Sequence, residues 1–75
     1  MRAVEVHGLD DPQLAEFVDN ARKEVFNLRF QHATGQLENT ARMRHAKSDL
    51  ARGLTVARQR GLDIEAELRK QRDAA

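Results

Sequence analysis

The sequence predicts an all-α fold, a long antiparallel two-helix hairpin with a short N-terminal segment and a frayed or partly helical C-terminal tail. Two stretches, around residues 14–28 and 43–57, repeat apolar side chains at spacings of three and four, the period of a helix with one buried face. Each stretch is followed by a glycine, Gly35 or Gly61, which is the usual residue at a helix end. Because the stretches are similar in length and joined by a short connection, we expect them to pack antiparallel.

The first helix is expected over about residues 11–34. Asp10 suits the N-cap, and Gln13 three residues later completes a capping-box pattern. Leu9 and Leu14 occupy the positions of a hydrophobic staple around this cap. The apolar stripe of this helix consists of Leu14, Val18, Ala21, Val25 and Leu28.

The second helix is expected over about residues 40–60, with Asn39 or Thr40 as its N-cap. Its apolar stripe consists of Met43, Ala46, Leu50, Leu54 and Ala57. The tail, residues 62–75, has Asp63 as a candidate cap but few apolar anchors, so we expect it to be frayed or only locally helical. The segment before the first helix is expected to form no more than a brief turn.

At 75 residues the chain is expected to be one domain, residues 1–75, near the lower limit for burying an adequate core. It has no cysteine, which excludes disulfides and thiolate metal sites and favours a reducing compartment. No apolar run approaches the ~20 residues of a membrane span, and the first residues lack the apolar centre of a signal peptide. We therefore expect a cytoplasmic protein with no membrane partner.

Candidate catalytic and metal-binding groups are few. Ser48 lies in the middle of the second expected helix, away from any helix end. The histidines His7, His32 and His45 fall in different segments, without the i, i+4 spacing of a helical metal site. The glycines are isolated and form no phosphate-binding loop. These observations argue against an enzyme and against a bound cofactor.

Positive charge is concentrated in the middle of the chain. Residues 36–61 hold six cations against two anions, whereas residues 1–35 hold four against six and residues 62–75 three against four. A solvated face is the simpler interpretation of the second helix alone, but the acids that usually balance such a face are scarce there. Several arginines with few acids suit phosphate, because each guanidinium can donate two hydrogen bonds. Since this helix has no aromatic residue for stacking on single strands, recognition of folded RNA through backbone and shape fits better.

Phe26 and Phe30 do not fit a self-contained hairpin. They are four residues apart and lie, with Ala33, on a face of the first helix more than about 100° from its apolar stripe. Either the N-terminal segment or the tail covers them, or they form a docking surface that meets RNA or a neighbouring protein.

Residues 26–52, FNLRFQHATGQLENTARMRHAKSDLAR, closely resemble the family of bacterial large-subunit ribosomal protein L twenty-nine. The pieces FNLRFQ, ATGQLENTAR and DLAR carry this resemblance, and LDDPQLAEFVDNARKEV is similar in pattern to the family's first helix. The resemblance implies a helical hairpin that binds large-subunit ribosomal RNA near the polypeptide exit tunnel. It also implies a neighbouring exit-tunnel ribosomal protein, with nascent-chain factors docking nearby. The RNA-facing residues that it implies are Arg29, Gln31, Thr34, Gln36, Asn39, Arg42, Arg44, Lys47 and Arg52.

Three residues depart from the family pattern. Gly53 stands where a branched aliphatic residue is usual, Leu54 where a basic residue is frequent, and Ala57 where leucine is frequent. A mid-helix glycine costs about 1 kcal/mol relative to alanine, so we expect the hairpin beyond Leu50 to be thinly packed. We also expect marginal stability without RNA, which a sharp melting transition at high temperature would contradict.

The sequence therefore predicts a structural constituent of the large ribosomal subunit that acts through charge and position. An alternative of another class is a helical-hairpin protein–protein adaptor, which would dimerise through its apolar stripe and the phenylalanine pair. A subunit of an enzyme whose site is completed by another chain is a further alternative that the sequence leaves open.

Overall fold

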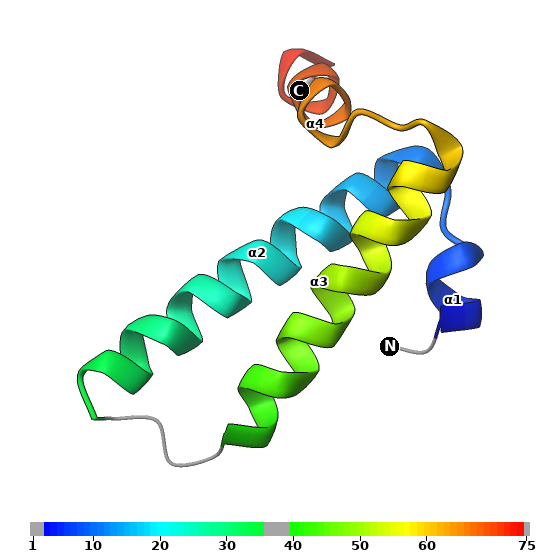
Figure 1. The fold of residues 1–75 in the computed structure, drawn as a ribbon. Coiled ribbons are helices and arrows are strands. Elements are labelled where there is room, and N and C mark those ends of the chain that lie inside the picture. Colours follow the sequence, from blue (N-terminus) through cyan, green and yellow to red (C-terminus); the bar gives the residue numbers. More distant parts are fainter. Residues whose placement is uncertain (1–2, 36–39, 75) are drawn as a thin grey trace.

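A computed structural model of the chain describes residues 3–35 and 40–74 and contains four helices there. They are α1 (Ala3–His7), α2 (Asp11–Ala33), α3 (Thr40–Arg60) and α4 (Ile64–Ala74). Helices α2 and α3 lie side by side as an antiparallel hairpin, and α1 and α4 flank the end away from the bend (Figure 1). The predicted all-α hairpin is confirmed, and the two long helices have the bounds expected from the sequence to within a residue.

Side-chain caps start two of the helices. Asp10 Oδ1 accepts a hydrogen bond from the Gln13 N–H at 2.8 Å, and Gln13 Oε1 accepts one from the Asp10 N–H at 3.2 Å. This is the predicted capping box of α2. Asp63 caps α4 in a similar way, because its Oδ1 accepts from the Ala66 N–H at 3.2 Å. Each cap satisfies an N–H group that has no partner within its own helix.

Glycines in the left-handed region follow both hairpin helices. Gly35 has a φ of 77° and Gly61 a φ of 67°, values that a side chain would strain. At Gly61 the chain closes back on the helix, since the Leu62 N–H donates to the Ala57 carbonyl at 2.8 Å. The predicted helix ends are therefore confirmed.

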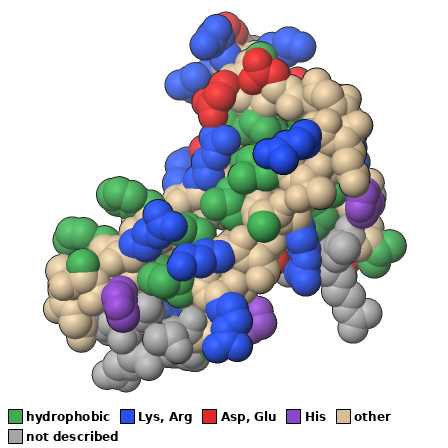
Figure 2. Space-filling view, viewed as in Figure 1, with side chains coloured by type: hydrophobic (Ala, Val, Ile, Leu, Met, Phe, Trp, Pro, Cys, Tyr) green, Lys and Arg blue, Asp and Glu red, His purple; other side chains and the backbone are tan. Residues whose placement is uncertain are grey.

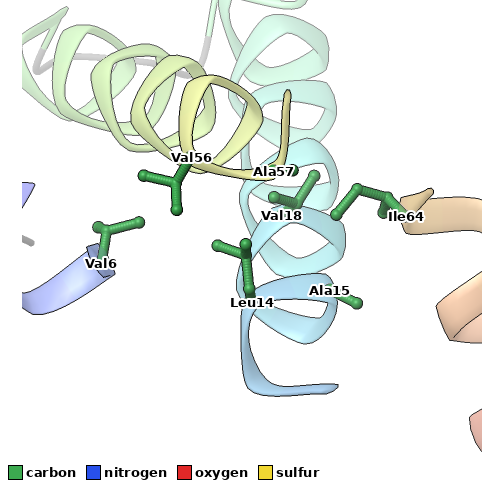
Figure 3. Close-up of a cluster of buried hydrophobic side chains, with 7 residues drawn as sticks. All are labelled: Val6, Leu14, Ala15, Val18, Val56, Ala57 and Ile64. Carbon is green, nitrogen blue, oxygen red and sulfur yellow. The ribbon is translucent and has the colours of Figure 1, made fainter. Parts of the chain in front are cut away.

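The main core lies at the end of the hairpin away from the bend, and every helix contributes to it (Figure 3). Its buried members are Val6 from α1, Leu14, Ala15 and Val18 from α2, Val56 and Ala57 from α3, and Ile64 from α4. The side chains of Val6 and Ile64 enter from opposite sides of the hairpin (Figure 3). A smaller cluster nearer the bend consists of Val25, Leu28 and Ala46.

The two apolar stripes differ in how deeply they are buried. The stripe predicted for α2 is buried along its whole length. In α3, Ala46 and Ala57 are buried, but the larger side chains of the predicted stripe are only half-buried. Val56, outside that stripe, is 3% exposed because α1 covers its side of α3.

The N-terminal segment is a helix and not only a brief turn. Its Val6 is completely buried. Arg60 fastens this helix to the hairpin, since its Nη2 donates to the His7 carbonyl at 2.9 Å and its Nη1 lies 3.2 Å from Asp11 Oδ1. One side chain at the end of α3 therefore holds α1 and the start of α2 together.

The tail is helical from residue 64 to residue 74 and packs against α2. Ile64 is buried and Leu68 half-buried at this contact. Polar contacts add to it, because Arg22 forms an ion pair with Glu65 and Gln71 Nε2 donates to the carbonyl of residue 12 at 3.0 Å. The tail thus covers one side of the first half of α2.

Gly53 is a point of close approach between α3 and α2. A Cβ at this position would lie 2.7 Å from Val18 Cγ2 and 3.0 Å from Phe17 Cδ1. The expectation of a thinly packed hairpin beyond Leu50 is therefore wrong. The missing side chain lets the helices approach each other, and the main core forms around this point.

The replacement Gly53→Ala is expected to lower the free energy of unfolding by about 1 kcal/mol. Alanine improves helix propensity by about 1 kcal/mol, but overpacking a filled core costs about 1–3 kcal/mol, and the branched Val18 side chain cannot rotate away freely. Urea denaturation followed by circular dichroism measures the difference. Adding Val18→Ala removes the clashing methyl and should reduce the penalty of the alanine at 53. A more stable Gly53→Ala single variant would contradict the close approach.

Candidate nucleic-acid interface

The polar groups in the described part of the chain lie at its surface. Among residues 3–35 and 40–74, no cluster of histidine and acidic side chains could hold a metal ion. Within the same ranges no charged or polar side chain is buried, so each remains accessible to water. None of the helices in this part of the chain combines the length and apolarity needed to cross a bilayer. The functional chemistry of the described surface therefore lies in its exposed charges and exposed apolar groups.

Three cations of the basic middle segment form ion pairs with acids of the same chain. The pairs are Arg42 with Glu24 at 3.4 Å, Arg60 with Asp11 at 3.2 Å, and Arg52 with Asp49 at 3.8 Å. The side chains of Arg42 and Glu24 are 59% and 47% exposed, so this pair is solvent-screened and contributes only about 0–1 kcal/mol. Arg42 could exchange its carboxylate for a phosphate at little cost.

The other three cations of this segment, Arg44, Lys47 and Arg58, are exposed. They form no ion pair with any acid in the described ranges, 3–35 and 40–74. Lys47 follows Arg44 by three residues and precedes Arg58 by eleven, which places all three on one side of α3. Arg58 was not among the predicted RNA-facing residues, and its helical spacing from Lys47 is the signal that identifies it.

Lys47 and Arg52 lie on different sides of the hairpin. Arg52 precedes Val56 by one turn, and Val56 belongs to the same buried cluster as Val6 of α1. Lys47 precedes Leu54 by two turns, on the flank of α3 opposite Val56. The predicted RNA-facing residues of α3 are therefore not one continuous surface. Arg52 belongs to the α1 side, and Lys47 belongs to the side on which α4 packs.

The end of α2 adds one exposed cation to the α4 side. Arg29 follows Arg22 by two turns, and Arg22 contacts α4 through Glu65. Arg29 is exposed and forms no ion pair within the described part of the chain. Thr34 is the C-cap of α2, and its hydroxyl donates to the Gln31 carbonyl at 3.1 Å. Both residues thus take part in ending the helix, while the predicted Gln36 and Asn39 lie outside the described residues.

Phe26 and Phe30 are 70% and 62% exposed. Neither α1 nor α4 covers them, so of the two alternatives for this pair the internal one is wrong. Ala15, Arg22 and Phe26 follow one another at helical spacing and therefore lie on the same side of α2. Helix α4 covers this side near Ala15 and Arg22, and Phe26 and Phe30 lie on its uncovered continuation toward the bend. The side chains that share the uncovered half, called the bend surface below, are Phe26, Arg29, Phe30, Arg44 and Lys47.

The bend surface is positively charged. The helical segments 25–33 and 40–48 contain no Asp or Glu. Figure 2 shows Lys and Arg side chains grouped over the bend half of the hairpin, beside protruding hydrophobic side chains. Acidic side chains in that view gather instead near α4. This part of the surface is therefore suited to a partner that carries negative charge.

Comparison with known proteins agrees with this geometry. The model of the family described as Ribosomal L29 protein matches residues 5–60, a range that includes the whole hairpin and ends where α3 ends. The large ribosomal subunit protein uL29 of Maridesulfovibrio salexigens is 53% identical over 62 residues, 83% of this chain and 97% of that protein. The protein of the same name from Chloroflexus aurantiacus is 53% identical over 68 residues, 91% of this chain and 98% of its own length. No solved structure matches the chain significantly. Because the match spans the capped start of α2, the bend surface and all of α3, the chain belongs to the ribosomal L29 protein family.

Proposed function

We propose that this chain is a structural constituent of the large ribosomal subunit that binds ribosomal RNA near the polypeptide exit tunnel. The coarser part, that it is a non-catalytic ribosomal protein, follows from its family. The single observation that supports RNA binding is the pair Arg44 and Lys47. Both are exposed, have no carboxylate partner in the described ranges, and lie in the helical segment 40–48, which contains no Asp or Glu.

The hairpin would bind RNA by placing cations from two helices against phosphates. Arg29 comes from α2, and Arg44 and Lys47 come from α3, so a rigid packed pair of helices sets their relative positions. Arginine can donate two parallel hydrogen bonds to a phosphate, whereas lysine acts as a compact point charge. Contacts of this kind fix the orientation of a protein on RNA without reading its sequence. The chain would therefore hold RNA segments together by position and charge.

The remaining predicted residues have supporting roles in this proposal. Arg42 and Arg52 would reach phosphate after releasing the acids that pair with them. Gln31 and Thr34 would mainly shape the end of α2, because their described hydrogen bond is internal to it. Gln36 and Asn39 stay proposed contacts on the basis of the sequence motif.

Two protein partners are proposed from the family resemblance. They are a neighbouring exit-tunnel ribosomal protein and nascent-chain factors that dock nearby. The exposed face of α1 itself is the surface proposed for the neighbour, because RNA would occupy the bend surface and the cations Arg42 and Arg52. Cross-linking of assembled subunits through a photoreactive group at the exposed Val4 of α1 would identify what lies there.

RNA binding with steep salt dependence is the expected behaviour of the purified full chain. Three phosphate contacts predict a slope of about −3 in a plot of log affinity against log salt concentration. Filter binding to transcribed large-subunit ribosomal RNA, between about 50 and 300 mM salt, measures this slope. An unrelated RNA of equal length is the control for non-specific attraction. If the chain instead self-associates in a salt-insensitive way and fails to sediment with large subunits, the adaptor alternative is correct.

A further inference from the structure

We propose that Phe26 and Phe30 bind unpaired nucleotides of ribosomal RNA by stacking, while Arg29 between them holds an adjoining phosphate. The proposal rests on the function proposed above and names the RNA element that the bend surface selects. That element is a loop or bulge with exposed bases, and not a continuous duplex.

The two rings are presented to solvent side by side. Residues four apart lie on adjacent turns of one helix face, separated by about 6 Å along the axis. Phe26 is 70% exposed and Phe30 is 62% exposed, whereas Phe17 is half-buried against Gly53. Exposing two of the three aromatic side chains is unfavourable for the isolated protein and indicates that a ligand covers them in the assembled state.

The surroundings of Phe26 have the chemistry of a nucleotide site. A shallow, open depression on α2 lies beside its ring and is lined by Arg22, Lys23, Phe26 and Asn27. An aromatic face suits a base, an amide can hydrogen-bond a base edge, and the cations suit the backbone phosphate. Arg22 pairs with Glu65, and Lys23 pairs with Asp19 at 3.0 Å, so either cation would reach a phosphate by exchanging an exposed or half-buried carboxylate for it.

The charge around the pair favours RNA over a protein as the occupant. The helical segments 25–33 and 40–48 contain cations and no acids, so a polyanion is attracted to the surface that these segments form. Phosphates held by Arg44 and Lys47 would bring the attached nucleotides to the same side of the molecule as the rings. Helix α4 covers the same side of α2 from its N-terminal end as far as Arg22. The surface available for stacking therefore begins after Arg22.

Replacing both rings separates stacking from simple burial. In the variant Phe26→Leu/Phe30→Leu the side chains stay apolar but lose their π faces, and both positions are exposed, so the fold should be retained. Its affinity for large-subunit ribosomal RNA is expected to fall about tenfold or more, with an unchanged salt slope. Specific unpaired nucleotides that the wild-type chain protects from chemical modification should become reactive. The matched variant Phe26→Trp/Phe30→Trp keeps the π faces and should retain both affinity and protection.

Three results would overturn the proposal. Wild-type affinity and an unchanged footprint in the leucine variant would show that the rings do not stack on bases. Normal RNA binding by that variant, combined with failure to enter subunits that the wild-type chain enters, would assign the pair to a protein partner. Protection confined to paired RNA would exclude an unpaired element. Failure of the proposed function looks different, because then the wild-type chain itself would not bind the RNA.

Discussion

A chain carrying Arg44→Glu and Lys47→Glu is expected to bind large-subunit ribosomal RNA at least about 100-fold more weakly than the wild-type chain at roughly 0.1 M salt. Each phosphate contact contributes a factor of about eight at this salt concentration through counterion release, and two contacts contribute about 60-fold. Reversing the charges adds repulsion to this loss. The salt slope should also become shallower by about 1.8. Filter binding over a salt series measures both effects.

The pair Arg44 and Lys47 is chosen because neither side chain holds the described hairpin together. Reversing the charge at Arg42 would also replace its ion pair with Glu24 on α2 by a pair of like charges, so it is a less clean test of RNA binding. Arg69→Glu with Arg72→Glu makes the same change in net charge on α4, which lies beyond the residues matched by the family model.

The control variant should lose much less affinity than the bend-surface variant. Equal losses would mean that net charge alone controls binding. No loss in Arg44→Glu/Lys47→Glu would remove the basis of the proposed RNA interface. Circular dichroism of all three chains checks that the helices are retained.

The replacement Leu14→Ala is expected to lower the free energy of unfolding by about 2–5 kcal/mol. Leu14 is completely buried at the centre of the cluster that joins α1, α2, α3 and α4. Its truncation removes apolar contacts within this cluster and leaves a cavity, and both effects destabilise the folded state. A protein of 75 residues has a total stability of about 4–11 kcal/mol, so a large part of it depends on this side chain.

Urea denaturation of the isolated chain measures the loss. Val4→Ala is the matched control, because Val4 is 74% exposed and its truncation should change stability by less than about 0.5 kcal/mol. If Leu14→Ala is as stable as Val4→Ala, the four-helix cluster does not stabilise the protein in solution. The same measurement on the wild-type chain tests the expectation of marginal stability without RNA, which stays a prediction.

Local sequence signals predicted the hairpin well because they depend on neighbours along the chain. Asp10 and Gln13 lie within one turn of each other, and their reciprocal hydrogen bonds form regardless of the rest of the fold. The glycine signals at Gly35 and Gly61 are equally local, since each concerns the conformation of one residue. The periodic burial of α2 followed in the same way from a strongly regular stripe.

The antiparallel packing of the two long helices was predicted, but the residue contacts between them were not, and Gly53 shows why. Helix propensity ranks glycine as unfavourable at this position, yet its effect depends on Val18 and Phe17, which are more than thirty residues earlier in the chain. The docking of α1 and α4 on the hairpin could not be predicted for the same reason. Val6 and Ile64 belong to short segments with few apolar residues, and neither segment shows in its own sequence which surface it will cover.

The candidate site was predicted in part. The sequence indicated the cations around the bend, but not that Arg42 pairs with Glu24 or that Arg52 lies on the α1 side. Whether a cation is available depends on acids from another helix, which periodicity on one helix does not report. The exposure of Phe26 and Phe30 was left open for the same reason.

The sequence by itself determined the two long helices, their ends, the concentration of cations past the bend and the family to which the chain is similar. Only the tertiary structure decided that α1 and α4 complete the core, that a glycine lets the hairpin close, and that Arg44 and Lys47 are the exposed cations of α3 near the bend without a carboxylate partner in the described ranges. The physical reason is the range of the interactions. Caps, turns and helical periods are set within a few residues, whereas burial and ion pairing depend on side chains that meet only when the helices pack.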